Sequence, residues 1–240
     1  MGGRQVLAVR RSLAEALDGE LPEHERLAVA RSLVGELGAP GRLLELVADL
    51  ASGEGDPEAC ARLSYRHVLG FDKLLLVDAG SRHMLRAHLW HPGGGAAGGE
   101  DVHNHRSPLA SCVVRGRLTM ELYASGDGGG APAERYRESL AGRSADWLLE
   151  PAGAASLRLA QVAEYTAGST YALPAHTLHR ARTEAPGPTV TLFLETGRGR
   201  RRHTDVFTAG PHPEAVPKVP LSVRDYLAEL AALAELLRAS

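Results

Sequence analysis

Residues 168–179 read Gly168-Ser169-Thr170-Tyr171-Ala172-Leu173-Pro174-Ala175-His176-Thr177-Leu178-His179. A second histidine-containing stretch lies upstream and reads Val102-His103-Asn104-His105-Arg106. The upstream stretch places His103 and His105 at positions i and i+2, which lie on the same face of a β-strand. One strand can therefore present two imidazoles to a single metal ion. On its own such a pair is equally typical of a solvated surface, because the chain has 11 histidines. The decision rests on the downstream stretch.

The downstream stretch resembles the second motif of the cupin superfamily, which has the form G-x5-P-x-G-x2-H. Every position fits, except that His176 stands where the motif has its second glycine. The metal-ligand position of the motif falls on His179, whereas His176 holds the turn position. His176 remains a competing third ligand, and we favour His179 because it occupies the ligand position.

The upstream stretch resembles the first cupin motif, H-x-H-x3-E-x6-G. His103, His105 and Gly116 match this motif, and Leu109 stands where the motif has its glutamate. No carboxylate occurs between the second histidine and the glycine, which disfavours the two-histidine, one-carboxylate ligand set of many Fe(II) oxygenases. The resemblance therefore implies one divalent metal on His103, His105 and His179. Imidazole suits several metals, so Fe(II) follows from the resemblance, with zinc, nickel and manganese as alternatives.

Hydrophobic periodicity divides the chain into three regions. Apolar residues at helical spacing predict short helices within residues 4–63 and a C-terminal helix over residues 221–237, with Ser222 as its N-cap. Short β-rich runs separated by turns predict an all-β barrel in between.

With the cupin resemblance, the expected fold is an all-β core, a double-stranded β-helix (jelly-roll) barrel, with N-terminal helices and a C-terminal helix. The expected regions are an N-terminal helical region packed on the barrel (1–70), the barrel with its metal site (71–207), and an extended tail with the C-terminal helix (208–240). The expected strands are 73–77, 84–90, 109–114, 118–123, 157–165, 177–182, 189–194 and 202–207, and the expected loops include 93–99 and 126–132.

Composition excludes several classes of function. The formal net charge of the 240 residues is -2, which offers no general attraction to nucleic acid or membranes. The basic run at residues 198–202 lacks interleaved aromatic residues and is interpreted as a solvated loop. The N-terminus lacks the apolar core of a secretory signal, no apolar stretch is long enough to span a membrane, and only two cysteines are present. We therefore expect a cytoplasmic protein, a monomer or homodimer, whose partners are a small-molecule substrate and O2.

Among cupins, a set of three histidines without glutamate resembles the thiol dioxygenases, cysteine dioxygenase above all. In that family an aromatic-x-Arg sequence precedes a strand ending in Trp, and its arginine binds the substrate carboxylate. Here Phe71-Asp72-Lys73 places Lys73 at that position, and Leu178-His179-Arg180 matches the family's Leu-His-Arg. The strand at residues 188–195 resembles the one that carries the family's Ser-His-Tyr triad. That triad becomes Thr191, Phe193 and Glu195. The catalytic tyrosine is absent, so we expect activity on free cysteine to be weak or absent.

The strand expected at residues 84–90 offers further candidates. Alternation puts Arg86, His88 and Trp90 on one face. We interpret this face as a barrel lining that contacts a polar ligand, and a solvated outer face is the alternative. Together with Lys73, these three are the predicted substrate-binding residues.

Two catalytic candidates complete the predicted site. Glu195 is expected to pair with one of the cations or to act as a general base, and His176 is the other candidate. These features imply a non-haem Fe(II) oxygenase that acts with O2 on a small polar, carboxylate-bearing metabolite. The alternative is a non-oxidative isomerase, lyase or hydrolase that uses the metal as a Lewis acid. A metal-free, ligand-sensing cupin is a third class, which the three histidines disfavour.

Overall fold

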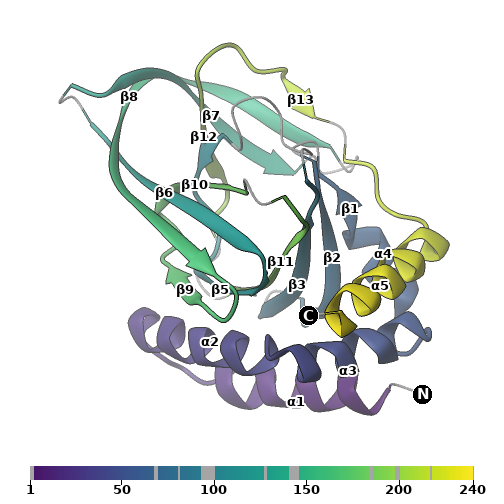
Figure 1. The fold of residues 1–240 in the computed structure, drawn as a ribbon. Coiled ribbons are helices and arrows are strands. Elements are labelled where there is room, and N and C mark those ends of the chain that lie inside the picture. The colour runs from purple at the N-terminus through teal and green to yellow at the C-terminus, as the bar shows by residue number, and fades with distance from the viewer. Residues whose placement is uncertain are drawn as a thin grey trace.

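Thirteen strands form two antiparallel sheets that face each other as a barrel, and helices cover one of them (Figure 1). The computed structural model describes residues 3–67, 70–80, 82–92, 101–126, 129–140, 146–183, 186–197, 201–216 and 218–239, and these counts refer to them. The first sheet has the order β1-β2-β3-β11-β5-β9, and the second has the order β13-β8-β6-β10-β4-β12-β7, with β8 also pairing with β7. Strands far apart in sequence are neighbours in both sheets, as in a jelly roll. The expected fold class is therefore confirmed.

The elements have the following bounds. The first sheet contains β1 (Tyr65–Arg66), β2 (Phe71–Asp78), β3 (His83–Trp90), β11 (Thr189–Thr196), β5 (Leu109–Arg115) and β9 (Thr170–Leu173). The second contains β13 (Ala215–Val216), β8 (Trp147–Thr166), β6 (Arg117–Ser125), β10 (Leu178–Arg182), β4 (Val102–His103), β12 (Thr204–Thr208) and β7 (Ala131–Leu140). The helices are α1 (Arg4–Leu17), α2 (Glu23–Leu37), α3 (Pro40–Ala51), α4 (Pro57–Leu63) and α5 (Val223–Arg238).

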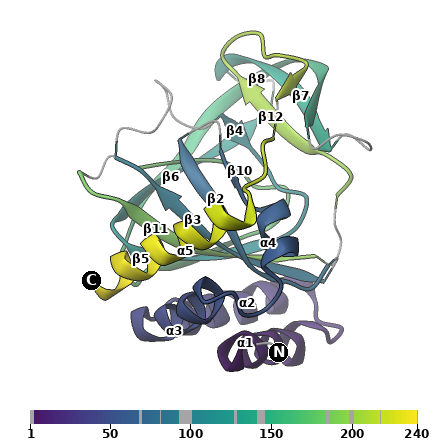
Figure 2. The ribbon, with the colours of Figure 1, turned by 90° about the vertical axis from the view of Figure 1, so that its right-hand side faces the viewer.

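The first sheet is buried on both faces, because helices pack on its outer face and side chains fill the barrel on its inner face. Along β3, Leu85, Ala87 and Leu89 belong to the large apolar cluster shared with the helices, whereas Trp90 belongs to the cluster inside the barrel. The alternation predicted for this strand is confirmed, and its outer face is covered rather than solvated. Helix α2 packs on β5, β9 and β11, and α1 to α3 lie together beneath the barrel (Figures 1 and 2).

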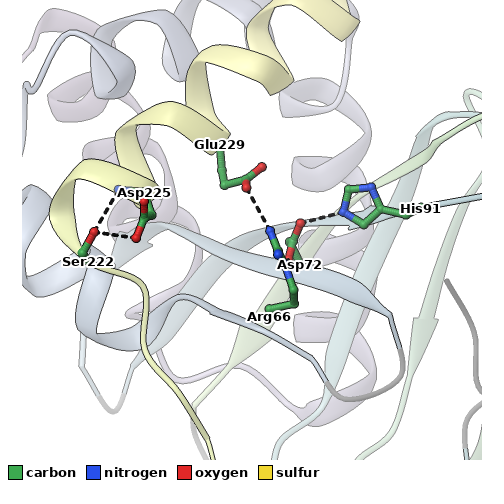
Figure 3. A network of polar contacts seen from close by, with 6 residues as sticks. All are labelled: Arg66, Asp72, His91, Ser222, Asp225 and Glu229. Carbon is green, nitrogen blue, oxygen red and sulfur yellow. Dashed lines mark hydrogen bonds and ion pairs between the residues drawn. The ribbon is translucent and has the colours of Figure 1, made fainter.

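Polar contacts tie the C-terminal helix to the edge of the first sheet (Figure 3). Helix α5 begins at the expected N-cap, where the Ser222 hydroxyl accepts the backbone N–H of Asp225 at 3.1 Å. The guanidinium of Arg66, on β1, contacts Glu229 of α5 at 3.1 Å and Asp72 of β2 at 3.0 Å. These contacts hold the segment that precedes α5 close to β1.

Two elements extend beyond the prediction. Strand β8 has 20 residues, although only residues 157–165 were expected, and β7 begins within the tract 126–132 that was expected to be a loop. Most side chains of β7 are exposed or half-buried, so its sequence lacks the apolar alternation of a strand, and pairing with β8 and β12 holds it in place. The loop at 93–99 and residues 198–200 of the basic run lie outside the described residues. Within the described chain, no helix combines the length and hydropathy needed to cross a membrane.

Candidate metal centre

Three imidazoles converge at the open end of the barrel. His103 ends β4, His105 follows it, and His179 lies on β10, where it is the cross-strand partner of His103. Their candidate ligand nitrogens all lie within 4.8 Å of one another, and the Nε2 atoms of His105 and His179 are 3.2 Å apart. Two nitrogens bound about 2.1 Å from one metal are separated by about 3.0–3.4 Å. His105 and His179 are therefore spaced as ligands of one ion, and the three histidines together form a group that could hold a metal.

Backbone carbonyls fix the orientation of two of these rings. The Nδ1 atom of His103 lies 2.9 Å from the carbonyl oxygen of Asp101, and Nδ1 of His179 lies 3.1 Å from that of Thr177. Because a carbonyl only accepts hydrogen bonds, each Nδ1 must donate its proton. Each Nε2 is then left with a free lone pair, which is the tautomer that binds a metal.

Burial keeps His103 and His105 in the neutral form that ligation requires. It is the main reason why the pKa of His103 is lowered to about 4, and the positive charge of Lys73 also contributes to this shift. Burial also lowers the pKa of His105 far below its ordinary value, with additional contributions from His179 and His103. Protons and a metal ion compete for the same nitrogen. Histidines with a lowered pKa are therefore ready to bind a metal at neutral pH.

An apolar side chain, that of Leu109, stands at the position where the first cupin motif has its glutamate. Leu109 is 1% exposed and belongs to the apolar cluster inside the barrel. Among the described residues, the group that can hold a metal contains only the three histidines and no carboxylate. The structure thus confirms that His103, His105 and His179 lie together in an arrangement that could hold a metal.

A cavity of about 390 Å³ lies beside the histidines, and His103 and His105 are part of its lining. Four of the predicted substrate-binding and catalytic residues also line it, namely Lys73, Arg86, His88 and Glu195. His88 is buried, its ring stacks on Phe193 at 4.9 Å between centroids, and burial holds its pKa well below the ordinary value.

The two charged candidates of opposite sign are paired with each other. Arg86 Nη1 lies 2.5 Å from Glu195 Oε2, and both side chains are largely buried. Glu195 is therefore the partner of Arg86, as one of the two sequence-based alternatives predicted. This contact compensates the charge of Arg86, so of the two predicted anchors for an anion the geometry favours Lys73.

Two predicted site residues do not reach the cavity. Trp90 stacks on Phe71, its cross-strand partner, at 4.0 Å between centroids and packs into the barrel cluster. His176 is exposed in the turn after β9 and is not part of the cavity lining. Of the predicted site residues, these two lie outside the lining of the cavity: Trp90 pairs in register with another aromatic residue, and His176 lies in the turn that precedes His179.

Sequence reasoning missed several polar residues of the cavity lining, among them His67, Glu138 and Lys218. Glu138 lies on β7, the strand whose sequence lacks alternation, and Lys218 lies in the segment that was interpreted as an extended tail. Burial raises the pKa of Glu138, and its carboxylate accepts a hydrogen bond of 2.8 Å from Thr204. One sequence signal pointed to Lys218, because the chain has only two lysines and the other is Lys73.

Several solved structures share the barrel at low similarity. An RmlC-like cupin from Shewanella frigidimarina NCIMB 400 is 16% identical over 56% of this chain and 82% of its own, with a TM-score of 0.35. A structure of the DMSP lyases RdDddP and RnDddQII is 18% identical over 81% and 92%, with a TM-score of 0.40. The oxalate decarboxylase of Lactobacillus farciminis in its formate complex is 11% identical over 59% and 32%, with a TM-score of 0.35. No protein-family model and no curated protein matches the chain. Likeness at this level carries no argument about activity, and the assignment as a jelly-roll barrel rests on the strand order.

Proposed function

We propose that this protein is a metal-dependent cupin enzyme, with Fe(II) as its metal, that acts with O2 on a small carboxylate-bearing molecule. The observation that carries the proposal is the set of three imidazoles without a carboxylate, with candidate ligand nitrogens within 4.8 Å of one another, beside a cavity of about 390 Å³. Neutral ligands leave the full double positive charge on the metal, which favours an anionic substrate. The subtype, like cysteine dioxygenase but without its tyrosine, follows from the sequence resemblance.

The residues of the chain have separate tasks in this proposal. His103, His105 and His179 would hold the metal, which when bound supplies a redox-active Lewis acid with open coordination positions. Lys73 attracts and orients the substrate carboxylate. The apolar edges of Phe193 and the neutral His88 exclude water from the inner wall.

Oxygen consumption by metal-loaded protein tests the proposal. Protein reconstituted with Fe(II) is screened against small carboxylic acids, with and without a thiol group, in air and under nitrogen. We expect turnover that requires both Fe(II) and O2 and that His179→Ala abolishes, with little or none on free cysteine. Equal turnover under nitrogen would contradict the oxygenase proposal, and fast formation of cysteine sulfinate would contradict the expected departure from cysteine dioxygenase.

Glu138 favours a second candidate function, a non-oxidative lyase, isomerase or hydrolase. Its carboxylate lines the cavity and is held by the Thr204 hydroxyl, and burial raises its pKa towards the range of a general base. A proton-transfer reaction at a metal-bound substrate would use such a group. Loss of anaerobic turnover in Glu138→Gln, with metal content unchanged, is the result that would support this candidate.

A further inference from the structure

The two lysines of the chain meet in the cavity. Lysine and arginine together number 27, and only Lys73 and Lys218 are lysines. They lie on different elements, β2 and the segment between β13 and α5, yet both line the cavity beside the candidate metal centre. The ordinary surface cation of this protein is therefore arginine, and an ammonium group occurs only here.

Both ammonium groups lie beside one aromatic ring. The Nζ atom of Lys218 is 4.5 Å from the centroid of the Tyr65 ring, and Nζ of Lys73 is 5.7 Å from the same centroid. Lys73 is the cross-strand partner of Tyr65, and a β-bridge between Tyr65 and Pro220 brings the C-terminal segment back to this edge. The convergence is thus built by backbone pairing, and it does not depend on side-chain rotamers alone.

Positive charge at this place is only partly balanced by the protein, because the Tyr65 ring lies beside both ammonium groups and the carboxyl group of Glu138 lies within electrostatic reach of Lys73. Neither lysine has a carboxylate within ion-pair distance among the described residues, whereas Glu195 of the same cavity is paired with Arg86. Burial lowers the pKa of Lys218 to about 8, and the positive charges of Arg86, Lys73 and Arg106 contribute to this shift. Two partly buried cations without an ion-pair partner are costly to hold close together, and an anion placed between them removes much of that cost.

Lys73 connects this charge to the metal centre. Lys73 lines the same cavity as Lys218 and as the candidate ligands His103 and His105. An anion beside Lys73 and Lys218 would occupy the same cavity as a group bound to the metal. One small molecule with an acidic group at each end can satisfy both.

We propose that Lys73 and Lys218, together with the Tyr65 ring, form a subsite for the second carboxylate of a small dicarboxylic acid whose other end faces the metal. A carboxylate has one charge shared by two oxygens, which matches two compact ammonium groups that can each turn a donor towards it. The proposal rests on the proposed function and narrows its substrate class from carboxylate-bearing to dicarboxylate.

A charge series on one carbon skeleton tests the subsite. Malonate, succinate and glutarate are titrated calorimetrically into Zn(II)-loaded protein, and the tightest binder is compared with its monoamide, which has nearly the same shape and one negative charge less. We expect the dicarboxylate to bind at least about ten-fold more tightly than the monoamide, since only the dianion engages both cations and the metal. In Lys218→Met this preference should fall to about two-fold or less, and Lys218→Arg should retain most of it.

Arg224→Met is the matched control, because it removes one positive charge from an exposed position on α5. It should bind the series as the wild type does. Unchanged preference in both Lys218→Met and Lys73→Met, with zinc content and thermal stability preserved, would overturn the proposal. Zinc is redox-inert and no turnover is measured, so this outcome is independent of whether the Fe(II) protein consumes O2.

Discussion

Asn104 stands between two candidate metal ligands, and both the nitrogen and the oxygen of its side-chain amide are hydrogen-bonded to Asp205. Its Nδ2 donates to the Asp205 carboxylate at 2.9 Å, and its Oδ1 accepts the backbone N–H of Asp205 at 2.8 Å. The carboxylate is held in turn by Arg135 at 2.7 Å and by Arg201 at 3.1 Å. The backbone of the ligand strand therefore has its position and direction fixed from the side opposite to the metal.

Removing this amide should weaken the metal site without removing a ligand. We expect Asn104→Ala to reduce metal affinity about 10–100-fold, which is the usual effect of losing an outer contact that orients ligands. The measurement is chelator competition with Zn(II) or Co(II). Glu164→Gln, at an exposed position on β8, is the control and should bind metal normally. Wild-type affinity in Asn104→Ala would show that the ligand strand is positioned by backbone pairing alone.

Alanine variants of His179 and His176 test which of the two is the third metal ligand. His103→Ala, His105→Ala and His179→Ala should each lose stoichiometric metal, because two imidazoles are left around the ion. His176→Ala should keep it, since His176 is exposed in the neighbouring turn. Metal content by mass spectrometry after gel filtration is the measurement. Full metal in His179→Ala together with loss in His176→Ala would reverse the assignment.

The ion pair between Arg86 and Glu195 should be strongly coupled, because both side chains are largely buried. Arg86→Met or Glu195→Gln removes one half of the buried ion pair, and the double variant removes both halves. We expect a coupling free energy of about 1–3 kcal/mol in the unfolding of metal-free protein. The exposed pair Arg117 and Glu164, 3.5 Å apart, is the control cycle and should give less than about 1 kcal/mol. Additive effects at Arg86 and Glu195 would contradict this picture.

The buried His88 predicts a pH dependence of stability. Burial holds its pKa well below the ordinary value of 6.5, so below pH 6.5 the unfolded chain takes up a proton that the folded chain does not. Metal-free protein should therefore lose stability as the pH falls, by up to about 1.4 kcal/mol per pH unit for this group. His88→Phe should make the slope of urea-unfolding free energy against pH shallower, whereas His24→Phe, at an exposed position, should leave it unchanged. If the slope of unfolding free energy against pH were unaltered in His88→Phe, this prediction would be wrong.

The parts of the molecule that could be predicted are those whose sequence pattern is local. The helices and the alternation along β3 follow from spacing, the two histidine motifs follow from the resemblance to cupins, and the structure bears out the elements and brings the three histidines together. Glu138 could not be placed, because β7 is held by long-range pairing with β8 and β12 and lacks a pattern of its own. The position of Lys218 depends on the bridge from Tyr65 to Pro220, which closes a loop of more than half the chain. Trp90 was assigned to the site because alternation gives the face of a residue and not its depth along the barrel.

The lowered pKa of Lys218 predicts how dicarboxylate binding depends on pH. Lys218 has a pKa of about 8, so its positive charge is present at pH 7 and is lost as the pH rises through 8. The other charged groups around it are Lys73, Arg86 and Arg106, and Glu138 of the same cavity, whose pKa burial raises, adds negative charge when it ionises. Both changes act in the same direction, since each makes the cavity less attractive to an anion.

Affinity of the Zn(II)-loaded protein for its tightest dicarboxylate should therefore fall as the pH rises through 8, by up to about ten-fold in all, because binding above pH 8 must first return one proton to Lys218. At pH 8 the binding reaction should take up a fraction of a proton, which calorimetry in buffers of different ionisation enthalpy measures directly. Lys218→Arg keeps its charge at every accessible pH, so its affinity should fall less steeply than that of the wild type from pH 7 to 9. A wild type that falls no more steeply than Lys218→Arg would mean that Lys218 does not bind the anion in its charged form.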